Sequence, residues 1–90
     1  MAWRIDLTET AGKQLGKLDR ATAKRITGFL RERLATLDDP RSLGKALHGP
    51  QLGAYWRYRV GDCRLICDIQ DDLMCVLVIE VGNRRELYRQ

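Results

Sequence analysis

Residues 55–66 read YWRYRVGDCRLI, two alternating stretches on either side of Gly61-Asp62. Side chains in a β-strand alternate between two faces, and glycine at the first position of a two-residue loop is typical of a type II′ hairpin turn. The sequence therefore predicts a β-hairpin with strands over residues 54–60 and 63–69.

The register of this hairpin separates basic from apolar side chains. Counting outward from the turn, Arg59 stands opposite Arg64, and Arg57 lies on the same face. Like charges in a direct cross-strand pair destabilise by up to about 1 kcal/mol, whereas guanidinium groups suit phosphate. We therefore expect a polyanion site; the alternative is a solvated face with Asp68 or Glu80 as ion-pair partners. The opposite face, expected to meet helices, contains Trp56, Tyr58, Leu65 and Cys67.

Upstream of the hairpin, apolar residues recur first at strand spacing and then at helical spacing. Residues 3–7 predict a short strand, and residues 9–18 and 20–37 predict two helices that form a helical hairpin. Asp38-Asp39-Pro40 ends the second helix, because the residue before proline avoids the helical backbone. Residues 41–53, rich in glycine, predict a loop.

Downstream of the hairpin, residues 73–81 are apolar up to Glu80, which predicts a central strand covered on both faces. A turn at residues 70–72 precedes it, a break at Gly82-Asn83 follows it, and residues 84–88 predict a short terminal strand. The whole order predicts an α+β fold over residues 1–90 as one domain. Its parts are an N-terminal strand, a helical hairpin and an antiparallel three-stranded meander, with the helices packed on one face of the sheet.

The composition is that of a folded protein with a basic surplus. Sixteen Lys and Arg residues stand against 12 Asp and Glu residues, for a net charge of +4, which is a weak hint of a polyanionic partner. No apolar run reaches the roughly 18 residues of a membrane span, and the N-terminus lacks the apolar stretch of a signal peptide. A cytoplasmic protein without membrane contact is therefore expected.

The soft metal ligands of the chain are three cysteines, Cys63, Cys67 and Cys75, and one histidine, His48. Cys63 and Cys67 share a face of the predicted strand but lie too far apart for a disulfide. We expect three small buried apolar side chains in a reducing compartment. A metal site would need a second Cys/His pair, so no metal or other cofactor is expected.

Three segments together resemble the RelE/ParE toxin superfamily of bacterial type II toxin–antitoxin systems. They read KALHG at 45–49, YWRYRVGDCRLI at 55–66 and VIEVGNRRELY at 78–88. The predicted element order and the chain length match over nearly the whole chain. The resemblance implies a toxin with a cognate antitoxin protein as partner, and a toxin–antitoxin complex that binds operator DNA.

The RelE branch of this superfamily implies an endoribonuclease that cleaves mRNA in the ribosomal A site without a metal. ParE-like members generally lack the full set of basic residues and the terminal tyrosine, so the RelE branch is favoured. Asn83 stands where many relatives carry histidine, and Cys63 and Cys67 stand where many carry aromatic residues. The resemblance assigns catalysis to Arg64, Arg84 and Tyr88, and RNA binding to Lys45, Arg57, Arg59 and Arg85.

Cleavage by such a set of residues would use the 2′-hydroxyl of the RNA as nucleophile, leaving a 2′,3′-cyclic phosphate and a free 5′-hydroxyl. Fixed guanidinium groups would stabilise the charge that develops on the phosphoryl oxygens. Tyr88 is the candidate base, if arginines lower its pKa from the usual value of about 10, and Arg84 would support the leaving oxygen. This is a poor acid–base couple near neutral pH, so we expect the ribosome to supply orientation.

Two other functions stay open at this point. The first is that of a ParE-like toxin that inhibits DNA gyrase and cleaves nothing. The second is that of an inactive or regulatory partner that binds DNA together with its antitoxin.

Overall fold

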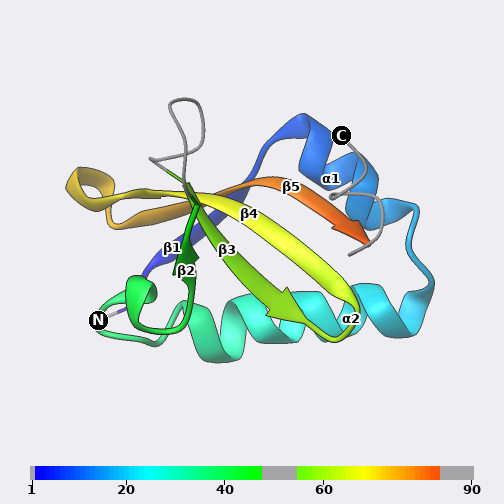
Figure 1. Cartoon of the computed structure of the whole chain (residues 1–90), viewed down its shortest axis with the longest axis horizontal. Coiled ribbons are helices and arrows are strands. Elements are labelled where there is room, and N and C mark those ends of the chain that lie inside the picture. Colours follow the sequence, from blue (N-terminus) through cyan, green and yellow to red (C-terminus); the bar gives the residue numbers. More distant parts are fainter. Residues whose placement is uncertain (1, 48–54, 84–90) are drawn as a thin grey trace.

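The computed structural model describes residues 2–47 and 55–83, and its five-stranded sheet has the order β1-β5-β4-β3-β2 (Figure 1). β1 pairs in parallel with β5, and the other neighbouring strands are antiparallel. Two helices precede the second strand, and α2 continues directly into a π-helical segment, Phe29–Leu34. The α+β fold and the order of its predicted elements are confirmed. The elements are β1 (Arg4–Leu7), α1 (Glu9–Gly16), α2 (Arg20–Gly28), β2 (Lys45–Ala46), β3 (Tyr55–Val60), β4 (Cys63–Gln70) and β5 (Cys75–Asn83).

The predicted hairpin register is confirmed. Arg59 pairs with Arg64 and Trp56 with Cys67. Gly61 has a φ of 60°, whereas Asp62 is not among the residues with positive φ. A type II′ turn requires positive φ at its first central position only, so the backbone agrees with the turn type expected from the sequence.

Both helices begin at side-chain caps. The hydroxyl of Thr8 accepts from the Ala11 amide at 3.1 Å, and the carboxylate of Asp19 accepts from the Thr22 amide at 3.1 Å; such caps stabilise a helix by about 1 kcal/mol each. Both helical segments end earlier than predicted. The last predicted residues, Leu18 and Leu37, each donate their amide to the carbonyl three residues back and not four. Leu18 donates to Leu15 in this way at 3.2 Å, which is a turn that closes a helix rather than continues it.

Three expectations about the remaining backbone were wrong. The segment predicted as a loop over residues 41–53 includes most of the 3₁₀ turn Pro40–Ser42 and the strand β2. A strand of two residues is too short for an alternation of apolar and polar side chains to be recognised in the sequence. The last strand begins at Cys75, because a 3₁₀ turn and the left-handed Met74 (φ 49°) precede it. Gly82 does not break this strand but pairs with Arg64. The predicted strand at residues 84–88 lies outside the described residues.

Helix α1 covers the part of the β5 edge that β1 leaves open. β1 pairs with β5 only as far as Val78. Beyond that point the hydroxyl of Thr8 donates to the Ile79 carbonyl at 3.0 Å, and the Val81 amide donates to the Gln14 side chain at 2.7 Å. These side chains satisfy backbone groups that would otherwise form an open sheet edge.

The core lies between the sheet and α2, which runs along it in Figure 1. On the sheet side Tyr58, Leu65 and Cys67 are buried, and Trp56 packs against them half-buried, so the predicted apolar face is confirmed. Burying one large aliphatic or aromatic side chain contributes about 1.5–3 kcal/mol. The helical residues of this core are Ile26, Leu30 and Leu34.

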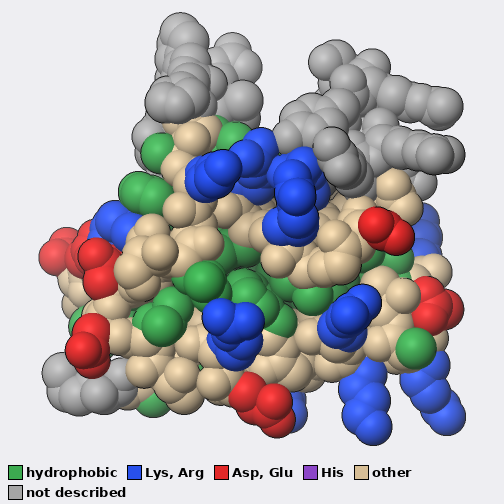
Figure 2. All heavy atoms as spheres, turned by 60° about the horizontal axis from the view of Figure 1, so that its bottom comes forward, with side chains coloured by type: hydrophobic (Ala, Val, Ile, Leu, Met, Phe, Trp, Pro, Cys, Tyr) green, Lys and Arg blue, Asp and Glu red, His purple; other side chains and the backbone are tan. Residues whose placement is uncertain are grey.

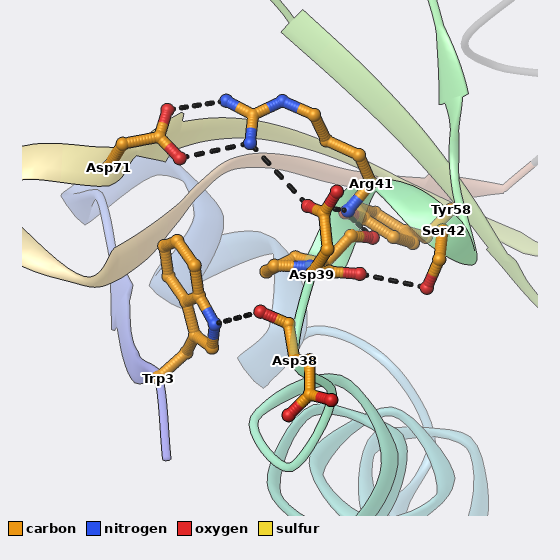
Figure 3. Close-up of polar contacts among 8 residues, drawn as sticks. Trp3, Asp38, Asp39, Arg41, Ser42, Tyr58 and Asp71 are labelled. Atoms are coloured by element: carbon orange, nitrogen blue, oxygen red, sulfur yellow. Dashed lines mark hydrogen bonds and ion pairs between the residues drawn. The ribbon is translucent and has the colours of Figure 1, made fainter. Parts of the chain in front are cut away.

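The segment that follows the helices is fastened to the sheet (Figure 3). The buried hydroxyl of Tyr58 donates to the Pro40 carbonyl at 2.8 Å. The guanidinium of Arg41 donates to both carboxylate oxygens of Asp71, at 3.0 and 2.5 Å, and lies 5.9 Å from the Trp56 ring. A Cβ atom at Gly44 would lie 2.8 Å from the Tyr58 ring, so this close approach requires glycine. These contacts position β2 beside β3.

We expect Tyr58→Phe to lower the free energy of unfolding by about 1–3 kcal/mol, because the Pro40 carbonyl would lose its donor. Urea unfolding followed by circular dichroism measures this loss. The matched control is Tyr55→Phe on the same strand, which removes a hydroxyl without touching this contact. Equal stability of the two variants would contradict the role given to the Tyr58 hydroxyl.

The Arg41–Asp71 pair predicts a dependence of stability on pH. The hydrogen bond from Arg41 holds the pKa of Asp71 below its usual range. The pair therefore stabilises the fold above the ordinary carboxyl range, and this contribution disappears as the pH falls through the lowered pKa. Asp71→Asn should be less stable than the wild type at neutral pH, and the difference should vanish in acid. Unfolding curves at a series of pH values, with Asp72→Asn as control, measure it; a difference that persists in acid argues against the pair.

Candidate nucleic-acid interface

The face of β3 and β4 opposite the core brings together four of the predicted site residues. Arg59 and Arg64 are paired directly, and Lys45 on β2 is paired with Arg57. Residues opposite each other in adjacent strands share a face of the sheet. We call this set of Lys45, Arg57, Arg59 and Arg64 the arginine face.

The members of the arginine face differ in exposure, which the sequence did not predict. Arg59 is exposed and Arg57 half-buried, whereas only 3% of Arg64 is accessible. Arg64 lies on the middle strand of the sheet, between Arg59 and Gly82. Because Gly82 has no side chain, it leaves room beside Arg64. The like-charged pair alone predicts that removal of either arginine leaves stability unchanged or slightly raised. The burial of Arg64 instead predicts a loss of stability when that side chain is removed.

A small hollow adjoins the hairpin turn and is bordered by both members of the arginine pair. Arg59, Arg64 and the turn residues Gly61, Asp62 and Cys63 line it. Two guanidinium groups beside one hollow form a fork of donors that suits a phosphate group. The arrangement can neutralise a phosphate and stabilise further negative charge that develops on it.

The other predicted catalytic and RNA-binding residues, Arg84, Arg85 and Tyr88, lie outside the described residues. The described chain ends at Asn83, which is paired with Cys63 directly after the turn. The described part of β5 therefore ends at the end of the sheet where Arg59 and Arg64 lie.

The buried titratable groups of the core are not suited to proton transfer near neutral pH. Burial raises the pKa of the Cys67 thiol to about 12 and raises that of the Tyr58 hydroxyl as well. Cys63, Cys67 and Cys75 are all buried and none of them forms a disulfide, as expected for small core side chains. Within residues 2–47 and 55–83, no group of three or more His, Cys, Asp or Glu side chains is placed to hold a metal ion. No helix in the same ranges is long and apolar enough to cross a membrane.

A set of basic residues on α2 and the π-helical segment also lies beside the hairpin, and none of them was predicted to belong to the site. Lys24, Arg25, Arg31 and Arg33 border a groove together with Arg59 (Figure 2). Their helical spacing showed only that they avoid the core. Their position beside the hairpin depends on tertiary packing: a Cβ atom at Gly61 would lie 3.0 Å from Nη1 of Arg25.

Several solved structures with this fold are toxins or toxin–antitoxin complexes, and the chain has the fold of the RelE/ParE toxin superfamily. It matches a chain of the toxin–antitoxin complex RelBE2 from Mycobacterium tuberculosis with a TM-score of 0.84 and 26% identity, over 93% of each chain. It matches the archaeal RelE–RelB complex from Pyrococcus horikoshii with a TM-score of 0.74 and 23% identity, over 100% of each chain. The isolated RelE toxin of E. coli matches with a TM-score of 0.71 and 24% identity, over 91% of this chain and 84% of that one.

Comparison of the sequence with family models gives a more specific result. The model described as the ParE toxin of type II toxin–antitoxin system, parDE, matches residues 5–88. The chain therefore belongs to this family and is a toxin of the type II toxin–antitoxin class. A search of curated proteins finds no match.

The unequal burial of the arginine pair predicts unequal effects on stability. Arg59→Ala removes an exposed like charge and should leave the melting temperature unchanged or slightly raised. Arg64→Ala should lower it, with a loss of at least about 1 kcal/mol in the free energy of unfolding, because it empties a buried volume. Thermal unfolding of both variants beside Arg64→Met, which retains most of the volume, measures the effect. Equal melting temperatures for Arg59→Ala and Arg64→Ala would show that the burial of Arg64 does not matter.

Proposed function

We propose that this toxin is an endoribonuclease that cleaves mRNA on the ribosome without a metal. The observation that supports the proposal is the cross-strand pair of Arg59 and Arg64 beside one small hollow. A like-charged pair at this position costs stability, so its presence on an otherwise well-packed hairpin favours a role in binding phosphate. Lys45 and Arg57, paired on the same face, extend the basic surface for an RNA backbone.

The proposed reaction is attack by the 2′-hydroxyl of the RNA on the adjacent phosphate. The bond from the 2′-oxygen to phosphorus forms while the bond from phosphorus to the 5′-oxygen breaks, so a 2′,3′-cyclic phosphate and a 5′-hydroxyl result. Arg59 and Arg64 stabilise the charge on the phosphoryl oxygens, a kind of contribution worth about 2.7–4 kcal/mol per donor in other enzymes. DNA has no 2′-hydroxyl and would not be cut by this route.

The proton transfers are assigned to residues of the C-terminal segment. Tyr88 takes the proton of the 2′-hydroxyl, and Arg84 supports the departing 5′-oxygen. Tyr58 does not compete for the first role, because it is buried, donates to the Pro40 carbonyl and has a raised pKa. Asn83 supplies no imidazole, so the proposal assigns the role of base to Tyr88.

Tyr88→Phe should lower the single-turnover rate of mRNA cleavage on programmed ribosomes by about 10²–10⁴, the usual contribution of a general base. The wild-type rate should rise with pH up to the pKa of Tyr88. Primer extension on a message translated in vitro measures both the rate and the cleavage sites. Tyr55→Phe is the matched control, and a rate for Tyr88→Phe equal to that of the wild type would remove the proposed base.

Inhibition of DNA gyrase is the second candidate function, and the match of residues 5–88 to the ParE toxin family favours it. A supercoiling assay with purified gyrase tests it beside the translation assay. Loss of supercoiling with intact mRNA would establish the gyrase function in place of the nuclease function. If neither assay responded, a regulatory role with the antitoxin on operator DNA would be left.

A cognate antitoxin is part of the proposed function. Several solved structures with this fold are toxin–antitoxin complexes, among them those from Mycobacterium tuberculosis and Pyrococcus horikoshii. An antitoxin that covers the arginine face would neutralise the toxin by keeping RNA away from Arg59 and Arg64.

A further inference from the structure

The side chain of Arg25 lies against the β3–β4 turn. A Cβ atom at Gly61 would lie 3.0 Å from Nη1, 3.8 Å from Cζ and 4.0 Å from Cδ of Arg25. The outer half of the Arg25 side chain therefore follows the surface of the turn, in space that the side chain of any other residue at position 61 would crowd. This contact brings a cation of α2 to the groove that Arg59 also lines.

The charge of this groove is open to a ligand. Arg25 and Arg59 are both exposed, and neither takes part in the ion pairs found within residues 2–47 and 55–83. Among the described residues that line the groove, Glu32 is the one carboxylate, whereas five side chains are basic. An exposed cluster of this kind attracts anions.

Arg59 connects the groove with the hollow beside Arg64. Both Arg59 and Gly61 line the two depressions, so the depressions lie on either side of one guanidinium. Arg64 borders the hollow, and Arg25 borders the groove. A nucleic-acid strand carries one phosphate for each nucleotide. A strand whose phosphate binds between Arg59 and Arg64 therefore has a neighbouring phosphate to place beside the turn.

The floor of the groove is apolar and partly aromatic. Phe29 lies half-buried against the core, with its ring 6.1 Å from the ring of Tyr58, and Val60 also lines the groove. Figure 2 shows hydrophobic side chains between basic ones on this side of the molecule. Proteins that bind single-stranded nucleic acids combine a basic groove with aromatic side chains that contact the bases. The groove offers both kinds of contact.

We propose that Arg25 and Arg59 form a second phosphate subsite, for the nucleotide next to the one held between Arg59 and Arg64. The inference rests on the proposed function, because it takes RNA as the ligand of the arginine face. The strand passes over Gly61, and Arg25 binds the phosphate on the far side of the turn. Arg25 thereby fixes the position of the RNA relative to Arg64 and takes no part in the bond changes.

The test measures binding apart from cleavage. The probe is a labelled single-stranded RNA of about eight nucleotides, within the usual site size of such grooves. It carries 2′-O-methyl groups throughout, which removes the nucleophile of the proposed reaction. Fluorescence anisotropy with the full chain gives the affinity at a series of salt concentrations. Arg25→Ala should weaken binding by about tenfold. It should also reduce the slope of log affinity against log salt by about 0.7, the contribution of one phosphate contact to a single strand.

Two further variants are the controls. Arg25→Lys keeps the charge and should keep the salt slope of the wild type. Arg20→Ala makes the same change on the same helix, at an exposed residue that does not line the groove. Its affinity should stay within about twofold of the wild type, with an unchanged salt slope. Because both arginines are exposed, all three variants should keep the melting temperature of the wild type.

Uncharged methylphosphonate linkages identify the phosphate that Arg25 binds. Placed at one linkage of the probe at a time, the methylphosphonate should weaken binding to the wild type at a position where it has no further effect on Arg25→Ala. That linkage should be next to the one that primer extension identifies as cleaved. At the cleaved linkage itself, the methylphosphonate should weaken binding to the wild type and to Arg25→Ala by the same factor.

Cleavage kinetics separate Arg25 from the residues that transfer protons. On programmed ribosomes, Arg25→Ala should raise the toxin concentration that gives the half-maximal rate by about tenfold, because it removes binding. Tyr88→Phe should instead lower the rate at saturating toxin.

Equal affinities and equal salt slopes for Arg25→Ala and Arg20→Ala would overturn the inference. A loss of affinity for an oligoglutamate peptide, without any loss for the RNA probe, would also overturn it, because the groove would then be a protein-binding site. Failure of the nuclease proposal gives a different result. In that case the wild type leaves mRNA intact, whereas the binding of the RNA probe still depends on Arg25.

Discussion

The register across Gly61 and Asp62 is the constraint on which the rest of the structure depends. A slip by one residue would exchange the two faces of β3 and β4, so that Arg59 would point toward α2 and Tyr58 toward solvent. The positive φ of Gly61 stabilises this pairing, because a type II′ turn matches the right-handed twist of the two strands. The core face of this hairpin stabilises the fold by more than the arginine pair on the other face destabilises it. Burial of Tyr58 and Leu65 contributes about 1.5–3 kcal/mol each, which exceeds the cost of up to about 1 kcal/mol for a like-charged pair, so the core can support the arginine face.

The features that sequence reasoning predicted correctly depend on local patterns. Alternation about Gly61-Asp62 determines which residues of the hairpin are opposite each other, and the spacing of Ile26, Leu30 and Leu34 determines the buried side of the helical layer. The missed features depend on contacts between distant segments. Arg64 lies on β4, which has strands on both sides, and its burial cannot be predicted from the pattern along one strand.

The candidate site also has one part that a local pattern predicts and one part that depends on contacts between distant segments. The arginine pair follows from the register, and the resemblance to a toxin family assigned roles to its members. The groove could not be predicted, because the basic residues of the helical layer are typical of any solvated helix until the hairpin turn is placed beside them. Arg25 and Gly61 are 36 positions apart in the chain, yet a Cβ atom at Gly61 would lie 3.0 Å from Nη1 of Arg25. This proximity places the basic residues of α2 beside the hairpin turn and Arg59.

The parallel pairing of β1 with β5 has a consequence for the order in which the protein is made. β1 begins at Arg4, the strand beside it begins at Cys75, and α1 hydrogen-bonds to β5 through Thr8 and Gln14. Synthesis proceeds from the N-terminus, so the first strand and the first helix must wait for the last strand before they can take their places. Pairing between distant segments slows folding because a long loop must close first. The sheet is therefore completed only after β5 has been synthesised, and a newly made toxin has an interval in which its first strand and first helix exist without the strand that they pair with.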